Sequence, residues 1–244
     1  MIPLRDDNKY GDNKIFATYL LIAINIFVFL FFQYLDDNPI NNDSFTQSYS
    51  LLPIEVFTGK DIVIKGFFAQ SPSPVYLTLI SSMFLHGGWM HLLGNMFFLF
   101  LFGDNLEAVM GSVRFVLFYL LCGILAGLFN VGLIVLFDQN QYVLNLGASG
   151  AISGIVGGYM MLFPRNNLYM FPILGISIHT RAFVWGAMWI TTQLLGCINL
   201  IFDHENGVGY GAHLGGAIAG FFLAKFFLMK EKNKSEASEA KSEK

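Results

Sequence analysis

Long apolar runs separated by short polar segments dominate the chain. Six of these runs are long enough, or nearly long enough, to cross a hydrocarbon core of about 30 Å as helices. They cover residues 15–35, 91–102, 115–137, 149–163, 183–202 and 208–229. The first run is too long for a signal-peptide core and lacks a cleavage motif after it, so we expect it to be retained. The pattern predicts an all-α membrane protein, a polytopic bundle of six transmembrane helices.

A segment of mixed character, residues 36–82, separates the first two runs. It contains Asn, Asp and Pro clusters beside apolar patches, so we expect it to fold against the bundle or the membrane surface rather than to span the membrane. Residues 1–14 are expected to form a cytoplasmic N-terminus and residues 15–229 the membrane domain. Residues 230–244 are charged and contain few apolar side chains, which predicts a disordered cytoplasmic tail.

Basic residues are distributed unevenly over this predicted topology. With six spans and both termini inside, twelve of the fourteen Lys and Arg residues fall on the inner side, and only Lys60 and Lys65 fall outside. Membrane proteins retain positive charge in their cytoplasmic loops. The distribution therefore predicts cytoplasmic termini, and it places the loops before Ser149 and before His213 on the outer side.

The overall composition is that of a membrane protein. Hydrophobic residues make up 55% of the 244 positions, charged residues make up 13%, and the mean hydropathy is +0.56, which lies well outside the usual range of soluble domains. The net charge of -3 provides no basic surface for nucleic acid, so no nucleic-acid partner is expected. Cys122 and Cys197 lie in separate apolar runs and are interpreted as core residues.

A serine and a histidine lie in glycine-rich sequence at the outer ends of two apolar runs. Ser149 opens the fourth run, and His213 lies six residues into the sixth. Pro164 should end the fourth helix at the inner face, and the fifteen residues before it rise about 22 Å through a core of about 30 Å. Ser149 therefore lies about 8 Å below the outer surface, and His213 lies about 9 Å below it. Equal depth permits a nucleophile and a base to meet.

Glycines at a spacing of four residues accompany both side chains. The spaced glycines are Gly150, Gly154 and Gly158 in the fourth run, and Gly211 with Gly215 and Gly216 with Gly220 in the sixth. Such small-residue faces let transmembrane backbones approach closely. Because Ser149 and His213 adjoin these faces, we expect the fourth and sixth helices to pack against each other there. Ordinary packing seams without a functional role are the alternative interpretation.

The second run contributes two further polar residues at a similar depth. His91 and Asn95 are four residues apart, so they share a helix face. Counted outward from Asp104, His91 lies about 10 Å below the outer surface, with Asn95 one turn deeper. Ionisable groups within a membrane are costly and indicate function unless they are paired. His86 and His179 are more simply interpreted as core residues.

The motifs together resemble those of the rhomboid intramembrane serine proteases, in the order that this family has, over residues 79–225. The resemblance lies in Gly147-Ala148-Ser149-Gly150, His91 with Asn95, Ala212-His213 with Gly216, the stretch from Gly103 to Glu107, and the stretch from Gly111 to Phe115. It implies a rhomboid-like fold, in which the two glycine-containing stretches form a turn between the second and third helices. It also implies that Ser149 is the nucleophile and His213 the general base, with His91 and Asn95 helping to hold the oxyanion.

Physical chemistry agrees with the implied roles. A serine hydroxyl becomes an effective nucleophile when a base within hydrogen-bonding reach takes its proton. Ser149 begins a helix, so unpaired backbone N–H groups and the positive end of the helix dipole lie beside the developing oxyanion. No acidic residue lies at the depth of His213, so we expect a Ser-His dyad with no metal and no cofactor.

Two positions depart from the pattern of the family. Many members have an aromatic ring one turn after the serine, where it stacks on the histidine, and this chain has Ser153 there. A Trp-Arg pair common in the outer loop of relatives is replaced by Leu77-Thr78. The fifth helix forms part of the substrate route in the family, so the aromatic residues Phe183, Trp185 and Trp189 either line that route or face lipid.

The sequence thus predicts an intramembrane serine endopeptidase that cleaves in or near the transmembrane segments of membrane proteins. Its partners would be such substrates and the lipid bilayer, and its location a prokaryotic cytoplasmic (inner) membrane with the site open to the exterior. The alternative is an inactive relative that binds transmembrane helices. A metalloenzyme using His86, His91 and His213 and a small transporter are weaker hypotheses, because the chain has no HExxH motif and no paired inverted repeats.

Overall fold

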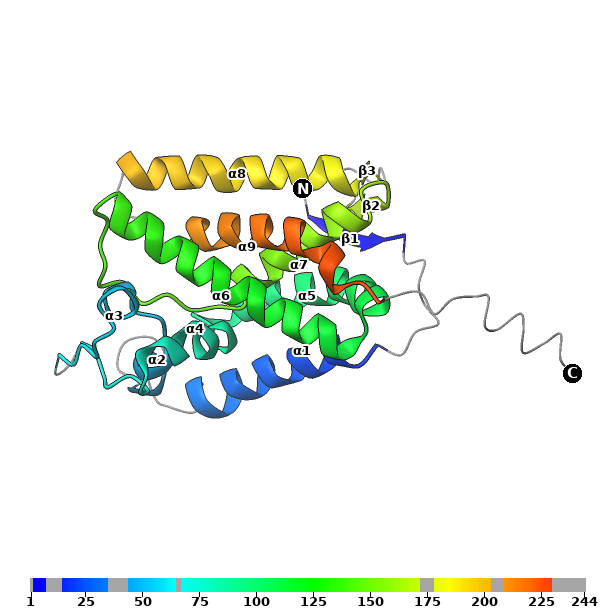
Figure 1. Ribbon diagram of the computed structural model, residues 1–244. Helices are drawn as coiled ribbons and strands as arrows, with labels where there is room; N and C mark the ends of the chain where they lie inside the picture. Colours follow the sequence, from blue (N-terminus) through cyan, green and yellow to red (C-terminus); the bar gives the residue numbers. More distant parts are fainter. Residues whose placement is uncertain are drawn as a thin grey trace, which may run out of the picture.

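Helices make up most of the part of the chain that the structure describes (Figure 1). The computed structural model describes residues 2–7, 15–34, 44–64, 67–171, 178–202 and 209–229. Its α-helices are α1 (Ala17–Val28), α2 (Ser44–Tyr49), α3 (Pro53–Thr58), α4 (Thr78–Ser81), α5 (Trp89–Met110), α6 (Ser112–Leu136), α7 (Ser149–Leu162), α8 (Ala182–Phe202) and α9 (Tyr210–Leu223). Short π- or 3-10-helical turns are η1 (Phe29–Gln33), η2 (Val75–Leu77), η3 (Ser82–Phe84) and η4 (Ala224–Phe227).

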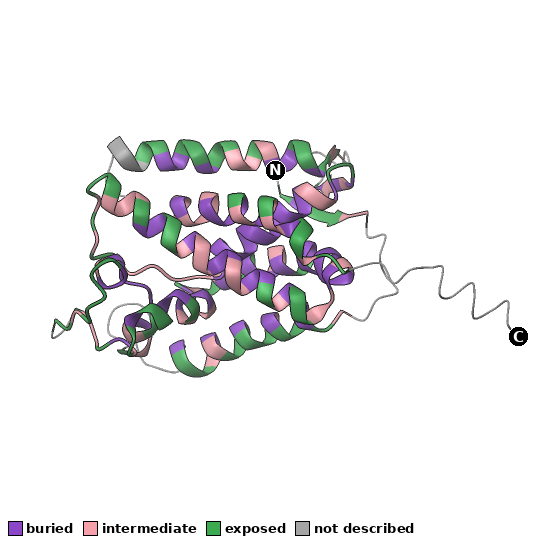
Figure 2. Cartoon of the chain, viewed as in Figure 1, coloured by how far each residue is buried: buried purple, intermediate pink, exposed green. Residues whose placement is uncertain are grey.

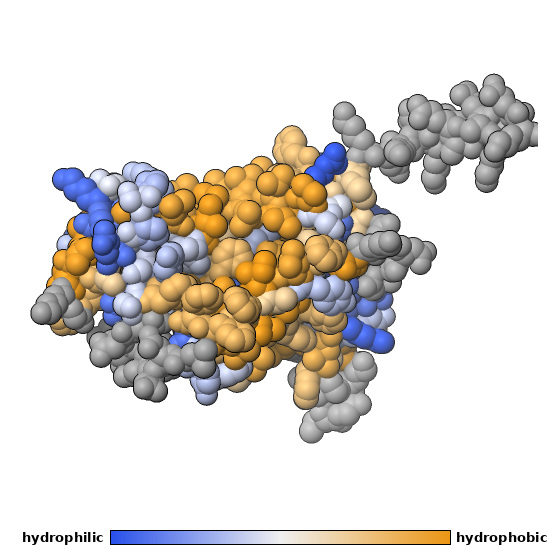
Figure 3. All heavy atoms as spheres, turned by 90° about the horizontal axis from the view of Figure 1, so that it is seen from below, coloured by the Kyte–Doolittle hydropathy of each residue, from blue (hydrophilic) through white to orange (hydrophobic). Residues whose placement is uncertain are grey.

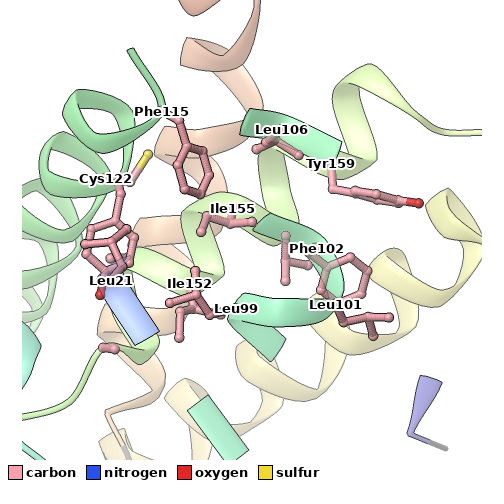
Figure 4. Close-up of a cluster of buried hydrophobic side chains, with 14 of the residues drawn as sticks. Leu21, Leu99, Leu101, Phe102, Leu106, Phe115, Cys122, Ile152, Ile155 and Tyr159 are labelled. Carbon is pink, nitrogen blue, oxygen red and sulfur yellow. The ribbon is translucent and has the colours of Figure 1, made fainter. Parts of the chain in front are cut away.

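The central helix of the protein is α7. All its residues from Gly150 to Met160 are buried, and Figure 2 shows this buried zone in the middle of the molecule. A helix that is apolar on every side must be enclosed by other elements, and α9, α6, α5 and α8 all contact α7. In Figure 4, Ile152, Ile155 and Tyr159 of α7 meet large side chains from α1, α5 and α6.

Apolar side chains also cover much of the outside. On the face in Figure 3, hydrophobic residues form a broad band between two more hydrophilic ends. Exposed side chains of α1, α5, α6 and α8 contribute to the apolar surface, among them Phe27, Phe100, Leu117 and Met188. Within the described residues, α5 and α6 are long and apolar enough to span a membrane, whereas residues 17–33 and α7 are apolar but shorter. An apolar surface of this extent indicates contact with lipid.

The helix boundaries differ from the sequence prediction mainly in α5. The predicted second run ended at residue 102, but α5 continues to Met110, and the chain reverses at Gly111, where φ is +77°. Of the two stretches expected to form this turn, the one that begins at Gly111 is confirmed, and the one over residues 103–107 is helical instead. Gly103 instead faces α1, since a Cβ there would lie 3.1 Å from Thr18 Cγ2. The predicted tail, residues 230–244, and residues 8–14 and 35–43 lie outside the described residues.

Glu107 has a structural role at the start of α1. Its Oε1 accepts hydrogen bonds from the backbone N–H groups of Phe16 and Ala17 at 2.9 and 2.7 Å. Its Oε2 accepts from the N–H and the hydroxyl of Thr18, both at 2.8 Å. The first N–H groups of a helix have no partners within it, so α5 supplies the cap that α1 lacks in its own sequence.

A small antiparallel sheet corrects the all-α prediction. Strands β1 (Pro3–Asp6), β2 (Asn167–Met170) and β3 (His179–Arg181) form a sheet in the order β1-β2-β3. Asp6 also accepts a hydrogen bond from the Asn105 amide at 2.8 Å and one from the Tyr159 hydroxyl. Strands of three or four residues carry little periodicity, and β1 pairs with a segment more than 150 positions away, so local patterns could not reveal this sheet.

The segment between α1 and α5 packs on the bundle through α3, α4 and η3. Leu51 and Asn145 exchange backbone hydrogen bonds at 2.9 and 2.8 Å. Glu55 is 1% exposed and accepts hydrogen bonds from Ile62 N–H at 2.8 Å and the Ser71 hydroxyl at 2.7 Å. Burial raises the pKa of the Glu55 carboxyl above its ordinary 4.5, although both hydrogen bonds act in the opposite direction. Folding therefore shifts the balance toward the neutral acid relative to the unfolded chain.

Glu55→Gln should make the protein increasingly more stable than the natural chain as the pH rises. A carboxyl whose pKa is raised by folding stabilises the fold below its unfolded pKa and loses that contribution as the pH rises through its folded pKa. Glutamine mimics the neutral acid and can serve both Ile62 and Ser71. We would compare thermal unfolding midpoints in detergent between about pH 4 and about pH 8, and a difference that does not change with pH would contradict the expectation.

Candidate active site

A single cavity of about 810 Å³ is lined by all four polar residues that the sequence singled out, Ser149, His213, His91 and Asn95. They come from three helices, α7, α9 and α5. Among the described residues of its wall there is no Asp, Glu, Lys or Arg. The four polar side chains therefore share a cavity whose described wall has no acidic side chain and no Lys or Arg.

Ser149 is the first residue of α7 and is partly buried. At the start of the helix, Ile152 N–H donates to the carbonyl of Ala148, the residue before Ser149, at 2.9 Å. The preceding loop is held in place: Gly147 N–H donates to the Ser82 carbonyl at 2.8 Å, and Asn145 pairs with Leu51. The serine hydroxyl therefore lies at a helix N-terminus, where the first backbone N–H groups have no partner within the helix.

Gly147 fits between Ser149 and His91. Its φ is +126°, which side chains other than glycine rarely adopt. A Cβ at this position would lie 2.8 Å from His91 Cε1, 2.9 Å from His91 Nε2 and 3.7 Å from Ser149 Oγ. The glycine therefore lets the His91 ring and the serine hydroxyl share one small space.

His91 and Asn95 have part of their hydrogen bonding fixed. Gly87 N–H donates to His91 Nδ1 at 3.2 Å, so a neutral ring carries its proton on Nε2, the nitrogen beside Gly147. The Asn95 amide donates one hydrogen bond to the His91 carbonyl at 2.9 Å and has a second N–H. Both side chains can therefore act as hydrogen-bond donors in the cavity.

His213 lies in the first turn of α9. Its N–H donates to the Gly209 carbonyl at 3.0 Å, and its Nδ1 is 2.8 Å from Oε1 of Gln193 on α8. The rings of Trp189 and Tyr210 lie 6.4 and 6.5 Å from the imidazole, measured between centroids. These contacts leave Nε2 as the nitrogen that can serve as a base.

The predicted close packing of the fourth and sixth helices is confirmed. A Cβ on Gly216 would lie 2.0 Å from the Gly150 carbonyl oxygen, and one on Gly220 would lie 1.9 Å from that of Gly154. Gly150 follows Ser149, and a Cβ on it would be 3.7 Å from Ala212 Cβ, next to His213. The other predicted face, Gly211 and Gly215, packs on Asn130 and Phe129 of α6 instead.

Several other sequence candidates can now be placed. Trp185 and Trp189 line the cavity, whereas Phe183 is 49% exposed and is not among the residues lining it. His86 is buried, with its ring centroid 5.2 Å from that of His91. His179 is exposed in β3, so its interpretation as a core residue is wrong. In the described residues, no group of three or more His, Cys, Asp or Glu side chains could hold a metal ion.

Ser153 and Gln193 change the picture derived from the sequence. Ser153 is buried, and its hydroxyl donates to the Ser149 carbonyl at 2.6 Å. Gln193 was missed. Its signal was a polar side chain within the apolar run 183–202, and such residues in membrane helices usually have a function.

Most of the chain is similar to proteins of a known family. The family model described as the rhomboid domain matches residues 74–230, which is well over half of the 244 residues. The chain belongs to the rhomboid family. This family comprises integral membrane proteins and includes intramembrane proteases that act on membrane-protein substrates.

Relatives come from bacteria, plants and mitochondria. The rhomboid relative YdcA of Bacillus subtilis (strain 168) is 34% identical over 64% of this chain and 69% of its own length. Rhomboid protease GluP of the same organism is 30% identical over 88% of this chain and 35% of its own length. Rhomboid protein 1, mitochondrial, of Saccharomyces cerevisiae is 30% identical over 83% and 50%. The chain thus spans half or less of the length of several relatives.

Proposed function

We propose that this rhomboid chain is an intramembrane serine endopeptidase that uses Ser149 and His213 as a catalytic dyad. The observation that carries the proposal is the single cavity that Ser149, His213, His91 and Asn95 line together, next to the Gly150–Gly216 contact. Its substrates would be transmembrane segments of membrane proteins. Such a segment must unwind locally before cleavage, because an intact helix shields its carbonyl groups.

The chemistry follows from the donors and acceptors in the cavity. Ser149 Oγ attacks the substrate carbonyl carbon while His213 Nε2 takes the hydroxyl proton. The oxyanion accepts hydrogen bonds from His91 Nε2–H, from Asn95 and from the backbone at the start of α7. His213 then gives the proton to the leaving amine. Water, deprotonated by His213, attacks the acyl-enzyme, and the proton returns to Ser149 when the ester breaks.

We further propose a six-helix transmembrane domain over residues 15–229 with both termini in the cytoplasm. The six spans would be α1 with η1, α5, α6, α7, α8 and α9. The distribution of Lys and Arg supports this orientation. A prokaryotic cytoplasmic membrane would place the loops before α7 and α9, and hence the opening of the cavity, on the exterior side. Residues 1–14 and 230–244 would then be the cytoplasmic ends.

The proposal is tested by incubating purified protein with a panel of transmembrane substrates and a fluorophosphonate probe. We expect cuts in or next to the transmembrane segment, mapped by mass spectrometry, that resist chelators and are blocked by the probe. The probe adduct should be found on Ser149. No product from any substrate together with no adduct on Ser149 would instead favour an inactive relative that binds helices.

Gly147→Ala should lower the rate of cleavage about 10²-fold, by analogy with the loss of one oxyanion donor. The new Cβ would lie 2.8 Å from the His91 ring and must displace it. Gly88→Ala is the matched control: its φ of +153° is also unfavourable for alanine, but nothing lies within 4 Å of the added Cβ. Both variants should lose stability, so rates are compared per folded molecule by active-site titration. Equal rates for the two variants would contradict a role for the His91 position.

A further inference from the structure

A short polar run interrupts the apolar helix α8 beside the cavity. It consists of Thr191, Thr192 and Gln193. The two threonines are exposed on the helix surface, but Gln193 is only 7% exposed and lines the cavity. Its Oε1 lies 2.8 Å from His213 Nδ1. A buried amide next to the base of the dyad needs an explanation, because a buried polar group costs free energy unless it is hydrogen-bonded.

The other contacts of Gln193 fix which end of its amide faces His213. Its Nε2 donates to Thr192 Oγ1 at 3.0 Å and approaches the Trp189 carbonyl at 3.4 Å. The Thr192 hydroxyl already donates its own hydrogen to the same Trp189 carbonyl at 2.6 Å. It can therefore only accept from Gln193. Both partners on that side are acceptors, so the NH₂ group must point to them and the amide oxygen to His213.

This orientation fixes the tautomer of His213. An amide oxygen only accepts hydrogen bonds, so the proton of a neutral His213 ring must be on Nδ1. The Nε2 atom then carries the lone pair and can take the proton of Ser149. His91 has the opposite arrangement, because its Nδ1 accepts from Gly87 and its proton is on Nε2. The two histidines are thus assigned as base and donor by their neighbours.

We propose that Gln193 is a positioning residue that holds His213 in its base tautomer, in the place that a carboxylate or a stacked ring takes in other serine hydrolases. The inference rests on the proposed function of the dyad. Ser153 stands where many relatives have the stacked ring, and its hydroxyl donates to the Ser149 carbonyl at 2.6 Å. The rings of Trp189 and Tyr210 lie near the imidazole, at centroid distances of 6.4 and 6.5 Å. Within the part of the chain that the structure describes, the side chain that hydrogen-bonds to His213 is that of Gln193.

A neutral acceptor has a chemical consequence. Gln193 orients the imidazole but adds no negative charge to stabilise the imidazolium that forms during proton transfer. Two other titratable side chains line the cavity with His213, namely His91 on α5 and Tyr210 on α9. Apart from the Ser149 hydroxyl, the described residues of α7 and α8 in the wall contribute no titratable group. Introducing a carboxylate at position 193 should therefore change the pH at which the enzyme becomes active.

Kinetic variants test the positioning role. Gln193→Met keeps the length of the side chain but removes the amide. It should lower kcat about tenfold to a hundredfold with little change in KM, because general base catalysis supplies about 10²–10⁴-fold and the variant loses a fraction of it. Gln193→Glu restores an acceptor, so it should recover part of kcat and move the acidic limb of the pH profile to higher pH. A purely structural role would give neither the recovery nor the shift.

Two threonines provide a matched pair. Thr192→Val removes the hydroxyl that fixes the Gln193 amide and should lower kcat a few-fold. Thr191→Val removes a hydroxyl from a neighbouring exposed threonine, which donates to the Ala187 carbonyl on its own helix at 2.9 Å, and should leave kcat unchanged. Equal kcat values for these two variants, or wild-type kcat in Gln193→Met, would overturn the proposal.

The tautomer can be measured without any substrate. In protein labelled with ¹⁵N-histidine, the signals lost in His213→Ala should be those of a ring protonated on Nδ1, and Gln193→Met should shift them toward the other tautomer. An Nε2-protonated ring in the natural chain would overturn the inference. If this spectrum is as expected but no substrate is cleaved, the proposed peptidase function fails while the role of Gln193 in holding His213 stands.

Discussion

Ser149→Ala and His213→Ala are each expected to reduce cleavage of a transmembrane substrate by about 10⁴-fold or more, and the double variant should be no slower than either single one. Nucleophile and base act as a unit, so removing one leaves the other without a function. What remains would be the contribution of the oxyanion donors and of substrate binding. Both side chains face the cavity and are only partly buried, so thermal stability should change little.

Ser153→Ala is the matched control for this comparison. It removes the same atom one turn later on α7, from a hydroxyl that donates to the Ser149 carbonyl. Its rate should stay within a few-fold of the natural chain. The assay follows product by mass spectrometry at equal concentrations of folded enzyme. Substantial cleavage by Ser149→Ala, or losses that multiply in the double variant, would reject the dyad.

The sequence was most informative where one property repeated along a helix. Continuous apolar runs predicted the long helices, and the boundary at Ser149 agrees with the start of α7. Glycines at a spacing of four predicted the contact between α7 and α9, because only a backbone without Cβ atoms allows such an approach. Depth counting placed Ser149, His213 and His91 at one level, and the structure brings these residues around one cavity.

Features that depend on contacts between distant segments could not be predicted. Of the two stretches expected to form the turn between the second and third helices, only the one at Gly111 reverses the chain, whereas Gly103 lies within α5 and allows the approach of α1. Gly211 and Gly215 have the same spacing as Gly216 and Gly220, yet they face α6, since adjacent positions on a helix point about 100° apart. The hydrogen bond between Gln193 and His213 joins α8 and α9, and the local sequence does not show which faces of these two helices meet.

Gly220→Ala is expected to destabilise the protein by about 3 kcal/mol, near the upper end for overpacked cores. The added Cβ would lie 1.9 Å from the carbonyl oxygen of Gly154, 2.5 Å from its carbonyl carbon and 2.7 Å from its Cα. All three atoms are backbone, so no side chain can move aside and the two helices must separate. Separation also widens the Gly150–Gly216 contact beside Ser149, so activity should fall together with stability.

Gly132→Ala, in α6, distinguishes this clash from a general effect of replacing glycine. Nothing lies within 4 Å of a Cβ at Gly132, which is exposed in its helix. Alanine is the better helix former by about 1 kcal/mol, so this variant should be as stable as the natural chain or more so. Unfolding in mixed detergent micelles would measure both. Equal changes in stability for the two substitutions would contradict the view that the close glycine contacts between α7 and α9 hold Ser149 and His213 together.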